Sequence, residues 1–274
     1  MNILGIDFEE WYHPELIQNY LTTEKKTDKV VKGIDKILEL LRKHETFATF
    51  FMVGELLESH PELLDKILDN EHEIAFHTMQ HVRLDKINEK IFEDEIIQFK
   101  KLTQTKSKGF RAPTFSLNNS SKWLIDVLER NNYEYDSSVV PAKTSMYGLP
   151  NAKKNPYKIS SKSLEHEDPK SKVTEFPILV TKLLGKTIPA GGGFYVRTLP
   201  QKIISNAIKN YEKNNFPAVF YIHSWELTPE YMPKIKLSKK DSFITYHNLN
   251  KVPERMNKLL SNFEFTSFER YIQK

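Results

Sequence analysis

The sequence of 274 residues contains no cysteine. This absence excludes disulfide bonds, thiol catalysis and cysteine-ligated zinc. It fits a protein of the reducing cytoplasm, which is the location we expect. Any metal must then be held by His, Asp and Glu side chains, a donor set that suits zinc, iron, manganese or cobalt.

Long apolar runs are absent as well. No stretch approaches the roughly 18 unbroken apolar residues that a membrane helix needs, so no transmembrane segment is expected. The start, MNILGIDFEEWY, lacks the basic region of a signal peptide, and we interpret it as a buried strand. The net charge of +4, from 40 basic and 36 acidic residues, predicts an ordinary solvated surface rather than a nucleic-acid-binding one. A phosphate-bearing substrate or an anionic membrane face is the lesser alternative.

Short apolar runs alternate with helical patterns through the first two-thirds of the chain. Strands are expected at Asn2–Phe8, Thr46–Val53, Glu73–Phe76 and Phe216–His223, and helices at Lys29–Lys43, Glu62–Asn70, Asn88–Leu102 and Ser120–Asn131. This alternation predicts an α/β fold with a parallel sheet or barrel, and residues 1–274 fit one such domain. A Pro-, Ser- and Lys-rich stretch near residues 140–172 is expected to be an irregular excursion. A helix and a last strand near Phe263–Phe268 should end the chain.

Carboxylates follow the first predicted strand. Asp7 and Glu9 share one face of an extended chain, and Glu10 comes next. Facing carboxylates repel each other, so a bound cation or a base with a perturbed pKa would explain them. A solvated strand end that starts a turn is the plainer alternative.

Histidines follow two further strands, at the edge where α/β barrels place their active sites. His77 and His81 are spaced i, i+4 and can chelate one metal ion, although this spacing also arises by chance. His223 ends the strand FPAVFYIH, and its near-neutral pKa suits a general acid or base. A half-buried, hydrogen-bonded histidine is the alternative there.

Two other residues bear on this edge. Arg111 follows the strand end GF and could orient a catalytic carboxylate through its guanidinium, or form an ordinary surface ion pair. Asp136, in the segment YEYDSS, could orient His223 or simply cap a turn.

These segments together resemble the polysaccharide deacetylases, also called the NodB-homology or carbohydrate esterase family 4 group. The motifs are IDFEEW, TFFMVGE, HEIAFHTMQH, GFRAPTFS, YEYDSS, TEFP and YIHSWE, in the order of that family. The chain looks closest to a branch found with exopolysaccharide and surface-glycan biosynthesis, through Asp7–Trp11, Gly191–Arg197 and His223–Glu226. The resemblance implies a distorted (β/α)7-type barrel.

The resemblance also implies roles. His77, His81 and one carboxylate would hold a divalent metal, with zinc preferred over iron, cobalt or manganese. Asp7 would be the general base for the attacking water, held by Arg111, and His223 would protonate the leaving amine. The family usually has adjacent aspartates, whereas this chain has Glu9 and Glu10. We prefer Glu9 as the metal ligand and Asp7 as the base. Glu10 is kept as the alternate metal carboxylate, and in that arrangement Glu9 would be the base.

The predicted function is metal-dependent hydrolysis of the N-acetyl group of an amino sugar in glycan biosynthesis, with release of acetate. The substrate could be an oligosaccharide or a lipid-linked or nucleotide-linked sugar. Trp11, Tyr195 and Trp225 flank the motifs and could stack on sugar rings, or pack in the core. Alternatives are an amidohydrolase of a non-sugar C–N bond, a catalytically inactive glycan-binding barrel, or a glycoside hydrolase, which needs two carboxylates and no metal.

Overall fold

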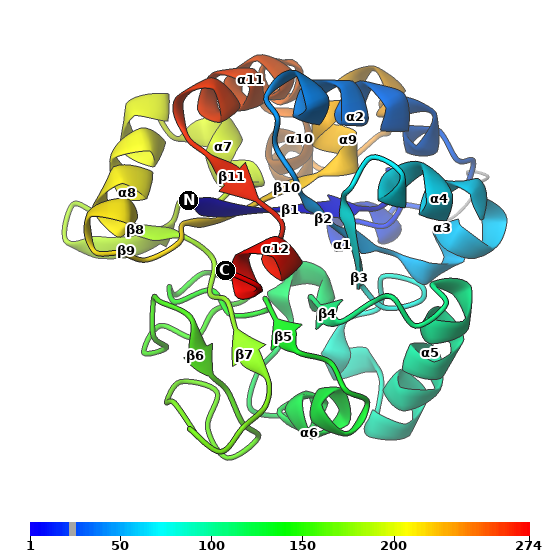
Figure 1. Ribbon diagram of the computed structural model, residues 1–274. Coiled ribbons are helices and arrows are strands. Elements are labelled where there is room, and N and C mark those ends of the chain that lie inside the picture. The colour runs from blue at the N-terminus through cyan, green and yellow to red at the C-terminus, as the bar shows by residue number, and fades with distance from the viewer. Residues whose placement is uncertain (22–25) are drawn as a thin grey trace.

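A computed structural model describes residues 1–21 and 26–274 and shows an α/β fold built on a curled sheet (Figure 1). The hydrogen-bonded strand order is β10-β1-β2-β3-β4-β5-β7-β6. The strands are β1 (Asn2–Phe8), β2 (Thr49–Met52), β3 (Glu73–Phe76), β4 (Gly109–Phe110), β5 (Tyr135–Asp136), β6 (Tyr157–Lys158), β7 (Thr174–Glu175) and β10 (Val219–His223).

The sheet closes into a distorted barrel. Neighbouring strands from β10 through β1 to β7 pair in parallel, and only the edge strand β6 joins antiparallel. Just after β7, Ile178 forms a parallel bridge to Val219 of β10, which brings the two ends of the sheet together. The predicted distorted parallel barrel is confirmed.

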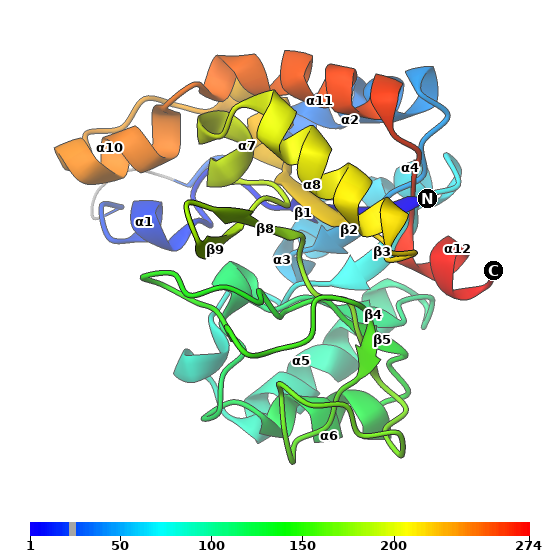
Figure 2. The ribbon, with the colours of Figure 1, turned by 90° about the vertical axis from the view of Figure 1, so that its left-hand side faces the viewer.

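Helices cover the outside of the barrel, as Figures 1 and 2 show. They are α2 (Ile34–Lys43), α3 (Gly54–Ser59), α4 (Glu62–Leu68), α5 (Glu89–Leu102), α6 (Trp123–Arg130), α7 (Phe194–Thr198), α8 (Gln201–Lys213), α9 (Ser224–Leu227) and α11 (Val252–Asn262). No helix among residues 1–21 and 26–274 is long and apolar enough to cross a membrane.

Alternation along β1 divides the core into two layers. Leu4, Ile6 and Phe8 belong to the large cluster between the sheet and the helices, and Ile3 belongs to the smaller cluster inside the barrel. Successive strand residues point to opposite faces, so Asp7 shares the interior side with Ile3. The sequence pattern thus aims this carboxylate into the barrel.

Most expected elements are present, with shorter ends. The stretch near residues 140–172 contains only β6 among its strands, as expected for an excursion. Elements that were not anticipated include the hairpin formed by β8 (Val180–Leu183) and β9 (Lys186–Pro189), and the helices α1 (Glu15–Gln18), α7, α8, α10 (Lys239–Tyr246) and α12 (Phe268–Ile272). The last strand is β11 (Phe265–Thr266), which pairs with β1.

Candidate active site and metal centre

The predicted functional residues surround one hollow of about 160 Å³ at the carboxyl ends of the strands. Its lining includes Asp7, Glu9, His77, His81 and His223. Helices α1 and α10 lie at this end of the barrel, opposite both chain ends (Figure 2). In α/β barrels the strand carboxyl ends carry the active site, so this hollow is the candidate.

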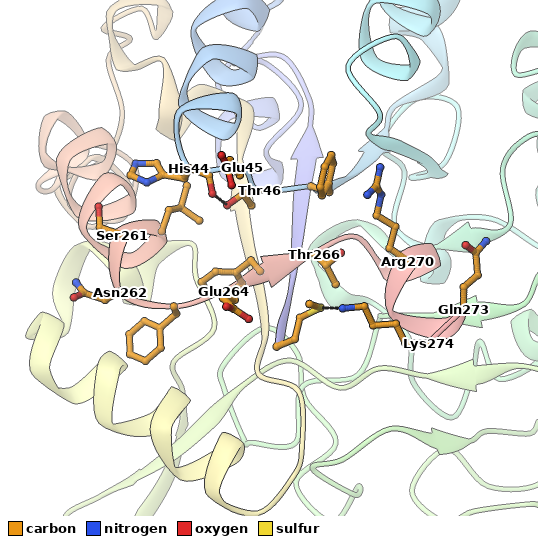
Figure 3. A pocket seen from close by; sticks show the side chains of 15 residues that line it. His44, Glu45, Thr46, Ser261, Asn262, Glu264, Thr266, Arg270, Gln273 and Lys274 are labelled. Carbon is orange, nitrogen blue, oxygen red and sulfur yellow. Dashed lines mark hydrogen bonds between the residues drawn. The ribbon is translucent and has the colours of Figure 1, made fainter.

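A larger hollow of about 700 Å³ lies at the other end of the barrel (Figure 3). It is bounded by residues that precede or flank the strands, including Met1, Phe47, Glu264 and Arg270. Size alone would favour it, but it has none of the predicted base, acid or paired histidines. The smaller hollow is therefore the site that carries chemistry.

Three side chains form a compact set of metal-type donors. One donor atom each from Glu9, His77 and His81 lies within 4.8 Å of the other two, and all three residues are buried. Two imidazoles and one carboxylate, with further coordination positions open, form the donor set typical of a catalytic zinc site.

Hydrogen bonds fix which nitrogen of each histidine faces this centre. His77 Nδ1 donates to the Arg111 carbonyl at 2.7 Å, and His81 Nδ1 donates to the His13 carbonyl at 3.0 Å. A carbonyl only accepts, so Nδ1 of each ring carries a proton and Nε2 is the nitrogen left to face this centre. Burial lowers the pKa of His77 to about 4, against the opposing charge of Asp7, so this imidazole is neutral.

A cation fits between Glu9 and His81. Glu9 Oε2 lies 2.7 Å from His81 Nε2, yet no donor with hydrogen-bond geometry reaches this oxygen within the described part of the chain. Burial raises the pKa of Glu9, but His81 and His223 outweigh it and keep the carboxyl ionised. A buried, ionised carboxylate together with two buried imidazoles forms a donor set that a divalent metal can occupy.

Glu10 points elsewhere. Its Oε1 accepts the Lys29 and Val31 N–H groups at 2.9 and 2.8 Å, and its Oε2 accepts the Trp11 N–H. These bonds tie the segment after β1 to the turn before α2. The structure therefore favours Glu9 as the ligand, and the alternative with Glu10 as the metal carboxylate is not supported.

Asp7 is held as the sequence predicts. Arg111 Nη1 donates to Asp7 Oδ1 at 2.6 Å, while its Nε and Nη2 donate to the carbonyl and hydroxyl of Ser137. The guanidinium fills the barrel interior beside Gly5, where a Cβ would lie only 2.6 Å from Arg111 Nη1. A wholly buried arginine with three directed bonds fixes the carboxylate in place.

His223 is held by a carboxylate that the sequence analysis did not assign. Glu226 Oε2 lies 2.7 Å from His223 Nδ1, and Glu226 Oε1 lies 2.8 Å from Arg197 Nε. Burial lowers the pKa of His223, but Glu226, Glu9 and Asp7 outweigh it and raise the pKa to about 9. The imidazole is therefore protonated at neutral pH and has a proton to donate. The i, i+3 spacing in the HSWE motif was the available signal.

Asp136 has a different setting from the one predicted. It accepts a hydrogen bond from the Ser138 hydroxyl at 2.5 Å and lies beside Glu175 on the neighbouring strand. Burial raises the pKa of both carboxyls, which favours a shared proton. The orienting partner of His223 is Glu226, and Asp136 instead supports the Ser137–Ser138 segment that carries Arg111's partners.

The three aromatic residues proposed for sugar contact lie in different places. Trp225 lines the hollow, stacks on His223 with ring centroids 5.0 Å apart, and donates its indole N–H to Glu9 Oε1 at 2.8 Å. Trp11 packs in a buried cluster and donates to the Thr27 carbonyl, while Tyr195 packs against the main core. Aromatic walls come instead from Phe115, Tyr147, Phe194 and Tyr221.

Comparison with known proteins agrees with this geometry. Residues 20–135 match the polysaccharide deacetylase family model, and residues 137–273 match a Domain of unknown function (DUF3473). The first half of the chain thus carries a polysaccharide deacetylase domain, and the second half carries the DUF3473 domain.

Named relatives share short regions. A peptidoglycan-N-acetylglucosamine deacetylase of Bacillus cereus is 36% identical over 96 residues, covering 33% of this chain and 35% of the relative. A chitooligosaccharide deacetylase of Bradyrhizobium is 34% identical over 61 residues, covering 22% and 28%. The chain thus spans about a third of the length of such relatives.

A solved structure shares the whole fold. A Mycobacterium smegmatis protein named for the polysaccharide deacetylases superposes with a TM-score of 0.60 at 15% identity. The match covers 99% of this chain and 89% of that protein, so it supports the fold alone.

Proposed function

We propose that this protein is a metal-dependent N-deacetylase that removes the acetyl group from an N-acetylglucosamine unit of a glycan. One observation carries the proposal: an arginine-held Asp7, a carboxylate-held His223 and the donors Glu9, His77 and His81 line the same hollow. A binding module needs no such combination of base, acid and metal donors. The names of the relatives supply the sugar.

The proposed reaction divides between the two sides of the hollow. A divalent metal, with zinc preferred, would polarise the acetyl carbonyl and make water more acidic. Asp7 accepts a proton as the water oxygen bonds to the carbonyl carbon. His223 then donates its Nε2 proton to the amide nitrogen as the C–N bond breaks, which releases acetate and a free amine. Arg111 and Glu226 keep the base and the acid aimed at the same bond.

The surroundings favour a sugar that is part of a longer molecule. The catalytic hollow of about 160 Å³ is smaller than the ~300–1,000 Å³ usual for ligand pockets. A second hollow of about 400 Å³ shares its walls Phe115, Met146 and Tyr147 and continues towards Arg83 and Asn118. We propose that the reacting N-acetyl group enters the first hollow and that a neighbouring sugar lies in the second. An oligosaccharide of a biosynthetic pathway is therefore preferred over a free monosaccharide.

The test is acetate release from N-acetylglucosamine and its oligomers, with and without a chelator, beside the Asp7→Asn and His77→Ala variants. We expect release that increases with oligomer length, stops with the chelator and returns with added zinc. Asp7→Asn should lower the rate by at least ~10²-fold, the contribution of one acid–base group. His77→Ala should abolish the chelator-sensitive release, because it removes one of the proposed metal ligands.

Other outcomes separate the alternatives. Release that survives chelation would reject the metal mechanism. Metal binding without release from any sugar would favour an amidohydrolase of a non-sugar C–N bond. Sugar binding with neither metal binding nor release would favour an inactive glycan-binding barrel.

A further inference from the structure

We propose that Glu55 and His13 form a positioning pair that holds the ligand His81 in register with the metal centre. This inference rests on the metal site of the proposed function. Neither residue lines the catalytic hollow among the described residues, and neither belongs to the base–acid–ligand set. The pair acts through the His13 backbone carbonyl, which accepts a hydrogen bond from His81 Nδ1.

The His13 ring has a single tautomer. Its Nδ1 accepts the Glu10 N–H at 2.9 Å, so Nδ1 has no proton of its own. Its Nε2 therefore carries the proton and donates it to Glu55 Oε1 at 2.7 Å. The ring is almost completely buried, at 1% exposure, and both of its nitrogens are thereby used.

The His13 carbonyl is the point of contact with the metal ligand. It accepts His81 Nδ1 at 3.0 Å and the Gln18 side-chain amide at 2.7 Å. The two imidazole rings also stack, with centroids 5.9 Å apart and planes 21° from parallel. Fixing the His13 ring therefore fixes the direction in which His81 Nε2 points.

Glu55 links both sides of this contact. Its side chain holds His13, and its backbone N–H donates to the Met79 carbonyl at 2.8 Å, within the loop that carries His77 and His81. The preceding Gly54 N–H donates to the Thr78 carbonyl at 3.0 Å. The first turn of α3 thus joins the segment after β1 to the histidine loop after β3.

The predicted consequence is a weaker metal site when the side-chain link is removed. Loss of an outer partner of a metal-bound histidine typically lowers metal affinity ~10–100-fold. Glu55→Leu removes the acceptor for His13, whereas Glu55→Gln keeps an amide oxygen that can accept the same proton. Glu58→Leu changes an exposed glutamate on the same helix and is the matched control.

The experiment measures zinc affinity of metal-stripped protein by competition with a chromophoric chelator. We expect an affinity loss of ~10–100-fold for Glu55→Leu and near wild-type affinity for Glu55→Gln and Glu58→Leu. His13→Asn is the second variant, because its amide can reach the Glu10 N–H but not Glu55, and it should match Glu55→Leu. A cooperative unfolding transition, measured for each metal-stripped variant, shows that the variant is folded.

Several results would contradict the proposed positioning role of Glu55 and His13. Folded Glu55→Leu and His13→Asn with wild-type zinc affinity would remove any positioning role. An equal loss in Glu55→Gln would show that charge, rather than this hydrogen bond, matters. Wild-type protein that fails to bind zinc would instead reject the metal centre itself, so the two failures are distinguishable.

Discussion

The two sides of the candidate site hold their histidines in opposite ways. On the β3 side, the Nδ1 atoms of His77 and His81 donate to backbone carbonyls, which leaves Nε2 of each ring to face the candidate metal centre. On the β10 side, His223 faces the Glu226 carboxylate, which raises its pKa to about 9. The same side chain thus becomes a metal ligand or a proton donor according to its partner.

This contrast indicates that the hydrogen-bond partner of each histidine, rather than the histidine itself, determines whether it acts as a metal ligand or as a proton donor. A neutral carbonyl orients an imidazole and favours its protonation only weakly, whereas a carboxylate orients it and favours its protonation strongly. Glu9 lies between the two groups, 2.7 Å from His81 Nε2 and 3.9 Å from His223 Nε2. Substitutions of the partners therefore test the comparison more directly than substitutions of the histidines.

The largest effect is expected from substitutions of the adjacent residues Glu9 and Glu10, whose carboxylates point in different directions. Glu9→Gln should reduce zinc affinity by more than the ~10–100-fold loss of an outer partner and abolish acetate release. Glu10→Gln should bind zinc normally but lower the free energy of unfolding by about 1–3 kcal/mol, because its amide oxygen can accept the Lys29 and Val31 N–H groups but its amide nitrogen cannot accept the Trp11 N–H. Chelator competition and chemical denaturation would show this, and zinc loss in Glu10→Gln alone would reverse the assignment.

Glu226→Gln should have the next largest effect, on the acid side alone. We expect a fall in kcat of about 10²-fold with zinc affinity retained. Glu226 raises the pKa of His223, so its removal should move the alkaline limb of the pH–rate profile from about pH 9 towards lower pH. Glu230→Gln, at an exposed carboxylate nearby, is the control. An unchanged alkaline limb would exclude His223 as the titrating acid.

Trp225→Phe should produce a smaller change that touches both sides. It removes the N–H that donates to Glu9 Oε1 but keeps a ring to stack on His223. Zinc affinity should fall by about 10-fold, the low end of the range for outer partners. Trp123→Phe on α6 is the matched control, and equal affinities for the two variants would contradict a role for the indole N–H.

The last effect concerns stability, and it is expected at the end of β3 that lies away from the metal centre. Burial raises the pKa of Glu73 to about 7, although Thr49, Tyr135 and the Glu269 N–H donate to it. The folded state therefore holds this proton more tightly, and the stability it contributes is lost as pH rises from about 4.5 through 7.

Glu73→Gln cannot lose that proton. Relative to wild type, its free energy of unfolding should rise by about 2–3 kcal/mol between pH 4 and pH 9, with zinc affinity unchanged. Urea denaturation at both pH values measures the difference. A difference that is constant with pH would show that folding does not raise the pKa of Glu73.

The sequence predicted the side chains at strand ends because two simple rules place them. Asp7, His77, Arg111 and His223 each follow an apolar run, and parallel strands bring their carboxyl ends to one edge. The barrel itself followed from the same alternation of apolar runs and helical patterns.

The features of the candidate site that could not be predicted from the sequence depend on loops and on the directions of individual side chains. Phe194, Met146 and Ile244 reach the hollow from an unanticipated short helix, an irregular stretch and α10, none with a clear apolar period. Glu226 was in view, but its role depends on a helical turn directly after β10. Trp11 lies two residues after Glu9 in the sequence yet packs in the core, where its indole N–H donates to the Thr27 carbonyl.

The first strand has a consequence for how the protein is made. β1 lies inside the sheet, and its neighbours β10 and β11 come from Val219–His223 and Phe265–Thr266. His223, the register partner of Asp7, lies more than two hundred residues further along the chain than Asp7. A ribosome-bound chain stalled before β10 would already contain the metal donors but not the proton donor. The complete candidate site therefore depends on a long-range pairing that becomes available only after β10 has been made.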